Sequence, residues 1–256
     1  MLRRIICKLG NVEHIKSGRI PADALQGVIM ENIDEGFAER LHLQGLNPYS
    51  QYVESRRDGR YWVIQTLTQE AGKQIIDPLL SPAFLSFHLN RIGKDISILE
   101  KTQSETHIKE LIDNFYFGQS ERIFRMRFLT PTAFKSKGEY IFYPNLRLLY
   151  GSLMRKYAAV CENEAEQDED TLESLVENTM IVRYDLKSVY NEIGRSRLPA
   201  FCGMIVIKAT GSQQLVNYLH FLLRFGEYSG VGIKSAMGMG AIKIFEKPGL
   251  YHSTET

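Results

Sequence analysis

The apolar positions in the first half of the chain alternate between the period of a strand and the period of a helix. PADALQGVIMENI repeats its apolar residues at helical spacing after Pro21, whereas the runs on either side of Asp58 and Gly59 alternate and are rich in Tyr, Trp, Val and Ile. The first pattern predicts a helix and the second a β-hairpin. The expected elements are a strand at 3–8, a helix at 22–33, a loop at 34–48, the hairpin around 58–59, a helix at 69–78 and a strand at 83–88.

The second half opens on a strand whose two faces differ. In RIFRMRFLTPTAF, Phe124, Met126 and Phe128 alternate with Arg125 and Arg127, so one face is apolar and the other is basic. SQQLVNYLHFLLRFGEYSG has the pattern of an amphipathic helix that begins with a serine N-cap. The other expected elements are helices at 145–157 and 169–178, strands at 180–192 and 199–209, and a terminal strand in AIKIF.

Each half therefore has the element order β-α-β-β-α-β, which is the order of a ferredoxin-like domain. We expect an α+β protein of two tandem ferredoxin-like, or RNA-recognition-motif-like, domains at residues 1–118 and 119–256. Because the sequence shows no internal repeat, this duplication follows from the order of elements alone.

The charges of the chain are unevenly spread. The net charge over 256 residues is +1, but residues 162–177 hold eight acids and no Lys or Arg, which leaves +9 on the remainder. A basic surface for a nucleic acid is therefore available if the acids face elsewhere. The acidic run is interpreted as a solvated loop that leads into a helix, or alternatively as a device that keeps RNA off one face. No stretch is apolar enough for a membrane span or a signal peptide, so we expect a cytoplasmic protein.

Four glycines crowd into GVGIKSAMGMG, near the end of the chain. They are Gly230, Gly232, Gly238 and Gly240. Phosphate loops of nucleotide-binding folds have a strand before the glycines and a helix after, and here the order is reversed, which argues against a P-loop or Rossmann site. Two interpretations remain. The run is a main-chain surface, with Lys234 and Ser235 at its crown, that lies against a phosphate backbone, or it is a tight helix-to-strand connection without a ligand.

Three segments resemble the CRISPR-associated repeat-processing endoribonucleases. They are GVGIKSAMGMG, RFLTPTAFKSKGEYIFYPN at 127–145, and AERLHLQGLNPYSQYV, in which a histidine precedes a Pro-aromatic-Ser turn. The resemblance implies two ferredoxin-like domains and an enzyme that cuts the repeat of a CRISPR transcript once. It implies cleavage without metal or other cofactor, with a 2′,3′-cyclic phosphate and a 5′-hydroxyl as ends. The implied partner is repeat RNA, and a CRISPR effector complex and a second copy of the chain are candidate further partners.

Metal-free RNA cleavage needs a base, an acid and a source of positive charge, and histidine suits the first two roles. The six histidines are His14, His42, His88, His107, His220 and His252. His88 and His220 fall on a predicted strand and helix, which favours structural roles. His42 lies beside hydroxyl groups and has the position that the resemblance implies for a catalytic histidine. Tyr49 and Tyr52 are candidates for orienting the scissile phosphate, and each is equally consistent with a strand residue packed on the sheet.

Four groups of residues are candidates for RNA contact. They are the glycine run with Lys234 and Ser235, the basic group of Arg125, Arg127, Lys135 and Lys137, the hairpin tip of Arg56, Arg57 and Arg60 beside Tyr61 and Trp62, and the pair of Arg195 and Arg197. Each basic group is equally consistent with a solvated surface. The leading hypothesis is a repeat-specific endoribonuclease. The alternatives are a non-catalytic RNA-binding protein of the same fold and a regulatory ferredoxin-like domain that binds a small molecule.

Overall fold

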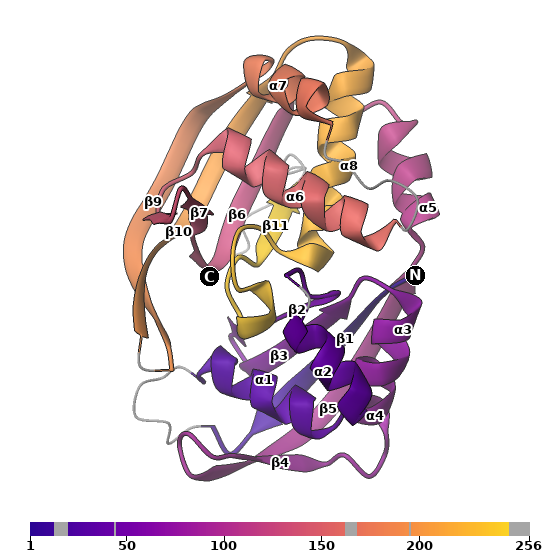
Figure 1. The fold of residues 1–256 in the computed structure, drawn as a ribbon, viewed down its shortest axis with the longest axis vertical. Coiled ribbons are helices and arrows are strands. Elements are labelled where there is room, and N and C mark those ends of the chain that lie inside the picture. The colour runs from indigo at the N-terminus through magenta and orange to yellow at the C-terminus, as the bar shows by residue number, and fades with distance from the viewer. Residues whose placement is uncertain (13–19, 44, 162–167, 195, 246–256) are drawn as a thin grey trace, which may run out of the picture.

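The first half of the chain is a five-stranded antiparallel sheet with its helices packed on one face (Figure 1). The computed structural model describes residues 1–12, 20–43, 45–161, 168–194 and 196–245. The strand order is β2-β3-β1-β5-β4. The strands are β1 (Leu2–Gly10), β2 (Tyr49–Arg56), β3 (Gly59–Thr66), β4 (Ser86–Leu89) and β5 (Lys94–Thr106). The helices are α1 (Ala22–Glu31), α2 (Glu35–Leu43), and α3 (Gln69–Ala71), which continues through a π turn (Gly72–Ile76) into α4 (Asp77–Leu80).

Two expectations for this half are wrong. The expected loop at 34–48 contains α2, which buries Phe37 and Leu41 in the core. The strand beside β1 is β5, which was not expected, whereas the predicted strand near 83–88 is the edge strand β4. Most of β5 beyond Ile98 is exposed and polar, so it lacks the alternating apolar pattern by which strands are found.

The second half is a four-stranded antiparallel sheet in the ferredoxin order, β11-β6-β10-β9. Its strands are β6 (Ile123–Thr132), β9 (Thr179–Ile193), β10 (Ser196–Ala209) and β11 (Ile242–Phe245). The short hairpin of β7 (Phe134–Ser136) and β8 (Glu139–Ile141) follows β6. The helices are α5 (Ile108–Leu111), which continues into a π turn (Ile112–Tyr116), α6 (Leu146–Val160), α7 (Glu169–Glu177) and α8 (Gln213–Ser229). The expected pair of ferredoxin-like folds is confirmed, and the boundary between residues 118 and 119 stays a prediction.

Sequence patterns account for the main elements of this half. The apolar side chains of β6 are buried, whereas Arg125 and Arg127 lie on the opposite face, as the alternation predicts. The side chain of Ser212 accepts a hydrogen bond from the Leu215 N–H, so the predicted N-cap of α8 is confirmed. Val216 is buried in the first turn of α8, and the other buried residues of this helix follow it at helical spacing.

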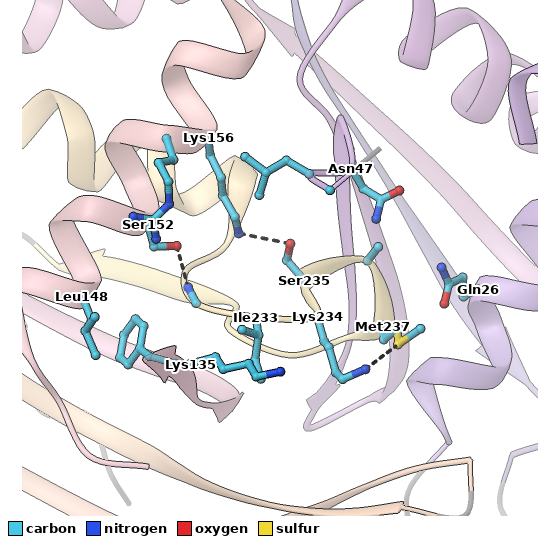
Figure 2. Close-up of a pocket in the computed structure, with 16 residues that line it drawn as sticks. Gln26, Asn47, Lys135, Leu148, Ser152, Lys156, Ile233, Lys234, Ser235 and Met237 are labelled. Atoms are coloured by element: carbon cyan, nitrogen blue, oxygen red, sulfur yellow. Dashed lines mark hydrogen bonds between the residues drawn. The ribbon is translucent and has the colours of Figure 1, made fainter. Parts of the chain in front are cut away.

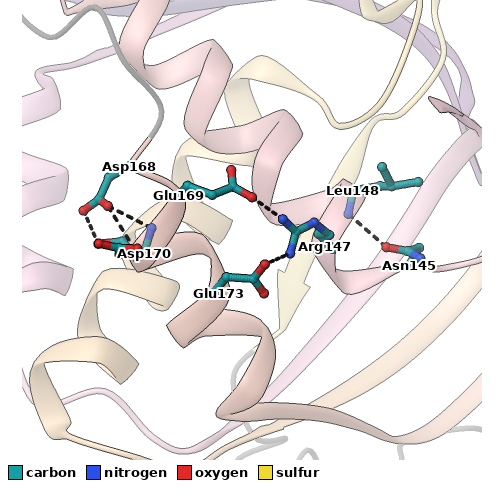
Figure 3. Close-up of polar contacts among 8 residues, drawn as sticks. Asn145, Arg147, Leu148, Asp168, Glu169, Asp170 and Glu173 are labelled. Atoms are coloured by element: carbon teal, nitrogen blue, oxygen red, sulfur yellow. Dashed lines mark hydrogen bonds and ion pairs between the residues drawn. The ribbon is translucent and has the colours of Figure 1, made fainter. Parts of the chain in front are cut away.

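The acidic run leads into α7, as one of its two interpretations predicts. Asp168 caps this helix by accepting hydrogen bonds from its first turn. Arg147 of α6 forms ion pairs with Glu169 and Glu173, so two of the acids hold α7 against α6 (Figure 3). Residues 162–167 of the run lie outside the described residues. The interpretation of the run as a device against RNA stays untested.

The two halves are packed against each other. The Ser50 hydroxyl of β2 donates to the Tyr228 carbonyl oxygen at 2.6 Å, and the Gln65 amide of β3 donates to the Glu227 carbonyl oxygen at 2.7 Å. The end of α8 therefore rests on the face of the first sheet that its own helices leave open. Leu2 is moreover buried in the core of the second half. Among the described residues, no helix is long and apolar enough to cross a membrane.

Candidate functional site

The glycine-rich segment between α8 and β11 is defined here as residues 230–240 and called the glycine loop. All four glycines have positive φ, with +64° at Gly230, +69° at Gly232, +88° at Gly238 and +73° at Gly240. A Cβ atom at Gly240 would lie 1.9 Å from the Val231 carbonyl oxygen, and one at Gly232 would lie 2.3 Å from that of Ala133. These positions therefore demand glycine for both conformation and space.

Substituting Gly240 by alanine is expected to lower the free energy of unfolding by on the order of 3 kcal/mol, because positive φ and a clash with main chain combine. Gly27→Ala is the matched control, since a Cβ at Gly27 in α1 meets nothing within 4 Å. That change should leave stability equal or slightly higher. Urea unfolding of both variants checks this, and equal stabilities would show that the loop does not need its glycine.

The glycine loop is held against the Thr-Pro-Thr segment at the end of β6. The Val231 N–H donates to the Gly240 carbonyl oxygen at 2.8 Å, which closes the loop on itself. The Gly240 N–H donates to the Pro131 carbonyl oxygen, and the Ile233 N–H donates to that of Ala133, both at 3.0 Å. Two segments that are about 100 residues apart in the sequence thus form one main-chain unit.

The crown of the glycine loop packs on the first half of the chain. Ala236 is buried in the core of that half, and a Cβ at Gly238 would lie 2.2 Å from the Cβ of Ala22. The buried Gln51 amide of β2 donates to the carbonyl oxygens of Ala236 and Ala22, at 3.0 and 2.6 Å. The Trp62 indole N–H donates to the Gln51 Oε1 atom at 2.7 Å and so fixes the direction of the amide. The loop therefore connects the two halves.

A buried lysine on α6 binds both the start of the glycine loop and its crown. The Lys156 ammonium group donates to the carbonyl oxygens of Ser229 and Gly230, at 2.9 and 3.1 Å, and to the Ser235 hydroxyl at 3.1 Å. Only 6% of Lys156 is exposed. Burial, with a smaller contribution from the neighbouring Arg155, lowers the pKa of Lys156 to about 7. Lys156 thus has a nearly neutral pKa, and its three hydrogen bonds go to the last residue of α8 and to the glycine loop.

A pocket of about 350 Å³ lies where the halves meet the glycine loop (Figure 2). It is lined by Gln26, Gly45, Leu46, Asn47, Phe134, Lys135, Leu148, Ser152, Arg155, Lys156 and residues 232–237. Each of the three segments that carry the family resemblance contributes to this lining. Lys135, Arg155, Lys156 and Lys234 make its wall cationic, and among the residues that the structure describes no acidic side chain lines it. Such a pocket suits an anionic ligand with several negatively charged groups.

His42 lies in the last turn of α2, rather than in a loop as expected. Its side chain is exposed, and the chain reaches the pocket three residues later, at Gly45. The apolar residues Phe37 and Leu41 turn one face of α2 into the core. His42 is therefore held on an anchored helix that ends shortly before the chain reaches the pocket, and its role stays a prediction.

The structure corrects the expectation for Tyr49 and restricts that for Tyr52. Tyr49 is fully buried in the core of the first half, and burial raises the pKa of its hydroxyl well above the usual range. A substrate does not reach that group, so Tyr49 is a packing residue. Tyr52 is two positions from Ser50 and shares its sheet face, which α8 covers, and burial raises the pKa of Tyr52 to about 12. Neither tyrosine lines the pocket.

The structure does not bring the predicted arginines to the pocket. Arg56 forms an ion pair with Glu54 at 2.9 Å and stacks over the ring of Tyr61, at 4.1 Å from its centroid, while Arg57 is exposed at the hairpin tip. Arg125 and Arg127 lie on the face of β6 that is turned away from its core side chains. Contact of these four arginines with RNA stays a prediction, on surfaces separate from the pocket.

In the glycine loop, Lys234 is the exposed cation and Ser235 is buried. Lys234 has left-handed backbone dihedrals, and its ammonium group lies 3.8 Å from the Met237 sulfur at the pocket wall. Ser235 faces Lys156 instead of solvent. The glycines are explained by backbone conformation and close packing, so their direct contact with RNA stays a prediction.

Sequence reasoning missed Lys156 and Arg155. A signal was available, because Lys156 follows Leu149 and Ser152 at helical spacing on the buried face of α6. A lysine on an apolar helix face needs acceptors from elsewhere in the fold. The position of those acceptors, more than 70 residues further along, depends on tertiary structure.

His220 has the structural role that the helical pattern favoured. It contacts the Ser120 hydroxyl at 2.9 Å and accepts a hydrogen bond from Arg224 at 3.2 Å. Burial and the Arg224 charge lower the pKa of His220 to about 4, so the ring is neutral near pH 7. His88 lies on β4 and pairs with Asp95. In the described ranges, no group of three or more His, Cys, Asp and Glu side chains is arranged to hold a metal ion.

Comparisons with known proteins agree with this arrangement. Residues 126–242 match the family of the CRISPR-associated endoribonuclease Cas6. Proteins of that name from Streptococcus thermophilus and Mycobacterium tuberculosis are each 37% identical over 221 residues, which is 86% of this chain and 90% and 70% of theirs. A solved structure described as a Cas6 product complex superposes with a TM-score of 0.78 at 22% identity, covering 96% of this chain and 99% of the other.

Proposed function

This chain belongs to the family of the CRISPR-associated endoribonuclease Cas6, and we propose that it cuts CRISPR repeat RNA in the pocket between its two halves. The relatives are named as endoribonucleases, which favours cleavage over the alternative of binding without cleavage. The proposal covers the chemistry of the cut, the residues that perform it and the partners. Repeat RNA is the substrate, and an effector complex, a second copy of the chain and a cytoplasmic location remain predictions.

One observation carries this assignment. Three segments that are far apart in the sequence converge on a single pocket of about 350 Å³ whose four charged side chains are all cations. A phosphodiester gains negative charge on its equatorial oxygens as it passes to a phosphorane, and fixed cations stabilise that charge. Arg155, Lys135 and Lys234 are exposed at the pocket and supply it. Lys156 acts indirectly, because it fixes the loop that carries Lys234.

The proposed reaction is an internal transesterification. The ribose 2′-hydroxyl next to the scissile phosphate loses its proton and attacks the phosphorus, and the bond to the 5′-oxygen of the next nucleotide breaks. The products are a 2′,3′-cyclic phosphate and a 5′-hydroxyl. His42, exposed shortly before the chain reaches the pocket, exchanges a proton with the attacking or the leaving oxygen, and no metal takes part.

The proposal is tested with the purified chain and repeat RNA from the adjacent CRISPR array, in EDTA. We expect a single cut, with a cyclic phosphate on the upstream product and a hydroxyl on the downstream product. Products that carry a 3′-hydroxyl and a 5′-phosphate, or cleavage that needs an added divalent metal, would refute the mechanism. Tight binding without any product would favour the non-catalytic alternative.

Lys234 at the pocket edge is expected to contact a phosphate. Replacing Lys234 by alanine should reduce the slope of log K against log salt by about 0.7–1 and weaken all RNA sequences alike. Lys73→Ala is the control, because Lys73 is also exposed but does not line the pocket. The check is fluorescence anisotropy at four or more salt concentrations, and parallel lines for wild type and Lys234→Ala would contradict the contact.

A further inference from the structure

Three large aromatic side chains are exposed within four residues of one another at the end of β8. Tyr140 is 40% exposed, Phe142 is 44% exposed and Tyr143 is 55% exposed. Burial of aromatic rings is favourable and isolated exposed rings are common, but three exposed rings within four residues are a local concentration of apolar side chains. We call Tyr140, Phe142 and Tyr143 the aromatic step.

The aromatic step adjoins the wall of the pocket through Tyr140. In the β7–β8 hairpin, Lys135 lies directly opposite Tyr140, with its ammonium group 5.9 Å from the ring centroid. Lys135 itself lines the pocket. The next cross-strand pair, Phe134 and Ile141, lies on the other face of the hairpin and packs in the core of the second half. The hairpin is thus anchored by one face and presents a ring beside a cation with the other.

The chain around the aromatic step is held in place. Pro144 follows Tyr143, and the Asn145 side chain then caps α6 by accepting a hydrogen bond from the Leu148 N–H at 3.0 Å. The first turn of α6 is also tied to α7 by Arg147 (Figure 3). Phe142 and Tyr143 therefore lie on a short connection between two fixed elements, so little conformational entropy is lost when a ligand stacks on them.

We propose that the aromatic step is a base-stacking site for single-stranded RNA that leads out of the pocket. The inference rests on the proposed function and adds a part of the substrate site that the catalytic pocket does not include. Unpaired bases stack on aromatic rings whatever their sequence, while lysines beside the rings follow the phosphates. Lys135 and the exposed Lys137 on the same hairpin provide those charges. A purely apolar protein partner would leave them unused, so the charges favour RNA as the occupant.

The test combines a protein change with an RNA change. Phe142→Ala/Tyr143→Ala removes two rings, and Phe142→Tyr/Tyr143→Phe keeps them. The RNAs are the repeat and a series in which single nucleotides are abasic, so that phosphates are unchanged and one base is missing. Phe117→Ala is the control, because Phe117 is 72% exposed directly after the π turn that follows α5 and does not line the pocket. Affinity is measured by anisotropy, cleavage by single turnover, and mass by sedimentation.

The alanine pair is expected to weaken binding of intact RNA about 5- to 100-fold for each base that stacks, whereas the ring-keeping pair and Phe117→Ala bind as wild type. At one or two abasic positions wild type should lose the same factor, and the alanine pair should lose nothing further. The stacking site would be overturned if the alanine pair bound intact RNA as tightly as wild type does, or if it lost as much affinity as wild type at every abasic position. Cleavage by wild type would still support the proposed function in that case. A wild-type dimer that the alanine pair converts to a monomer would assign the surface to self-association. Wild type that neither binds nor cuts would remove both proposals.

Discussion

Replacing His42 by alanine is expected to slow single-turnover cleavage of repeat RNA by about 10²- to 10⁴-fold, the range for loss of one positioned acid or base. RNA affinity should change less than threefold, because the cations of the pocket remain in place. His42 is exposed at the end of a helix whose apolar face is anchored in the core, so its removal leaves no cavity and the fold should persist. Rapid mixing of saturating enzyme with labelled RNA measures the rate.

Two further variants separate chemistry from surface effects. His42→Gln keeps a polar side chain without a group that takes up a proton, and it should be as slow as the alanine variant. His107→Ala changes another exposed histidine, at the start of α5, and should cut at the wild-type rate. A rate for His42→Ala within tenfold of wild type would mean that another group performs proton transfer.

Replacing Lys156 by methionine is expected to lower the free energy of unfolding at pH 9 by about 2–4 kcal/mol. The change leaves the carbonyl oxygens of Ser229 and Gly230 and the Ser235 hydroxyl without this hydrogen-bond partner, and each loss inside the protein has a cost. Because these groups set the position of the glycine loop, cleavage should fall as well. Lys109→Met, an exposed lysine on α5, is the control and should be near neutral.

The pH dependence of this difference identifies the buried ammonium group. The folded pKa of Lys156 is about 7 and lies below its usual value near 10.4, so between these values the unfolded chain binds the extra proton. Wild-type stability therefore gains from Lys156 as the pH rises from about 7 towards 10 and lacks that gain below 7. The stability advantage of wild type over Lys156→Met should be on the order of 2 kcal/mol larger at pH 9 than at pH 6.5. Urea unfolding at both pH values checks this, and a constant or reversed difference would contradict the assignment.

Local patterns predicted the elements that are decided locally. The alternation in β6, the serine cap of α8 and the hairpin around Asp58 and Gly59 all rest on neighbouring residues, and each occurs in the structure. The two turn residues are Arg57 and Asp58, however, and Gly59 is the first residue of β3. In α2 only two side chains reach the core, so the helical period was too weak to see. For β5 the signal was absent, because a long exposed strand needs no alternation of apolar residues.

The candidate site could be predicted only in part, because some of its contacts depend on tertiary structure. The glycine run was recognised as a backbone requirement because glycine at positive φ leaves a compositional trace. For Lys156 the sequence indicated only a lysine on a buried helix face, since its three acceptors come from a segment that tertiary structure brings to α6. The sequence left two interpretations of Tyr49 open, because a strand tyrosine in the core and one beside a substrate have the same sequence context, and burial alone separates them.

The central claim is that the RNA's own 2′-hydroxyl attacks the scissile phosphate in the pocket between the halves. The most direct measurement uses repeat RNA with a single 2′-deoxy nucleotide immediately upstream of the cut, incubated with wild-type protein in EDTA. The account predicts binding as tight as for all-ribose RNA and no product at that position. A product formed at the normal site and rate would contradict it, because a nucleophile other than the 2′-hydroxyl would then be at work.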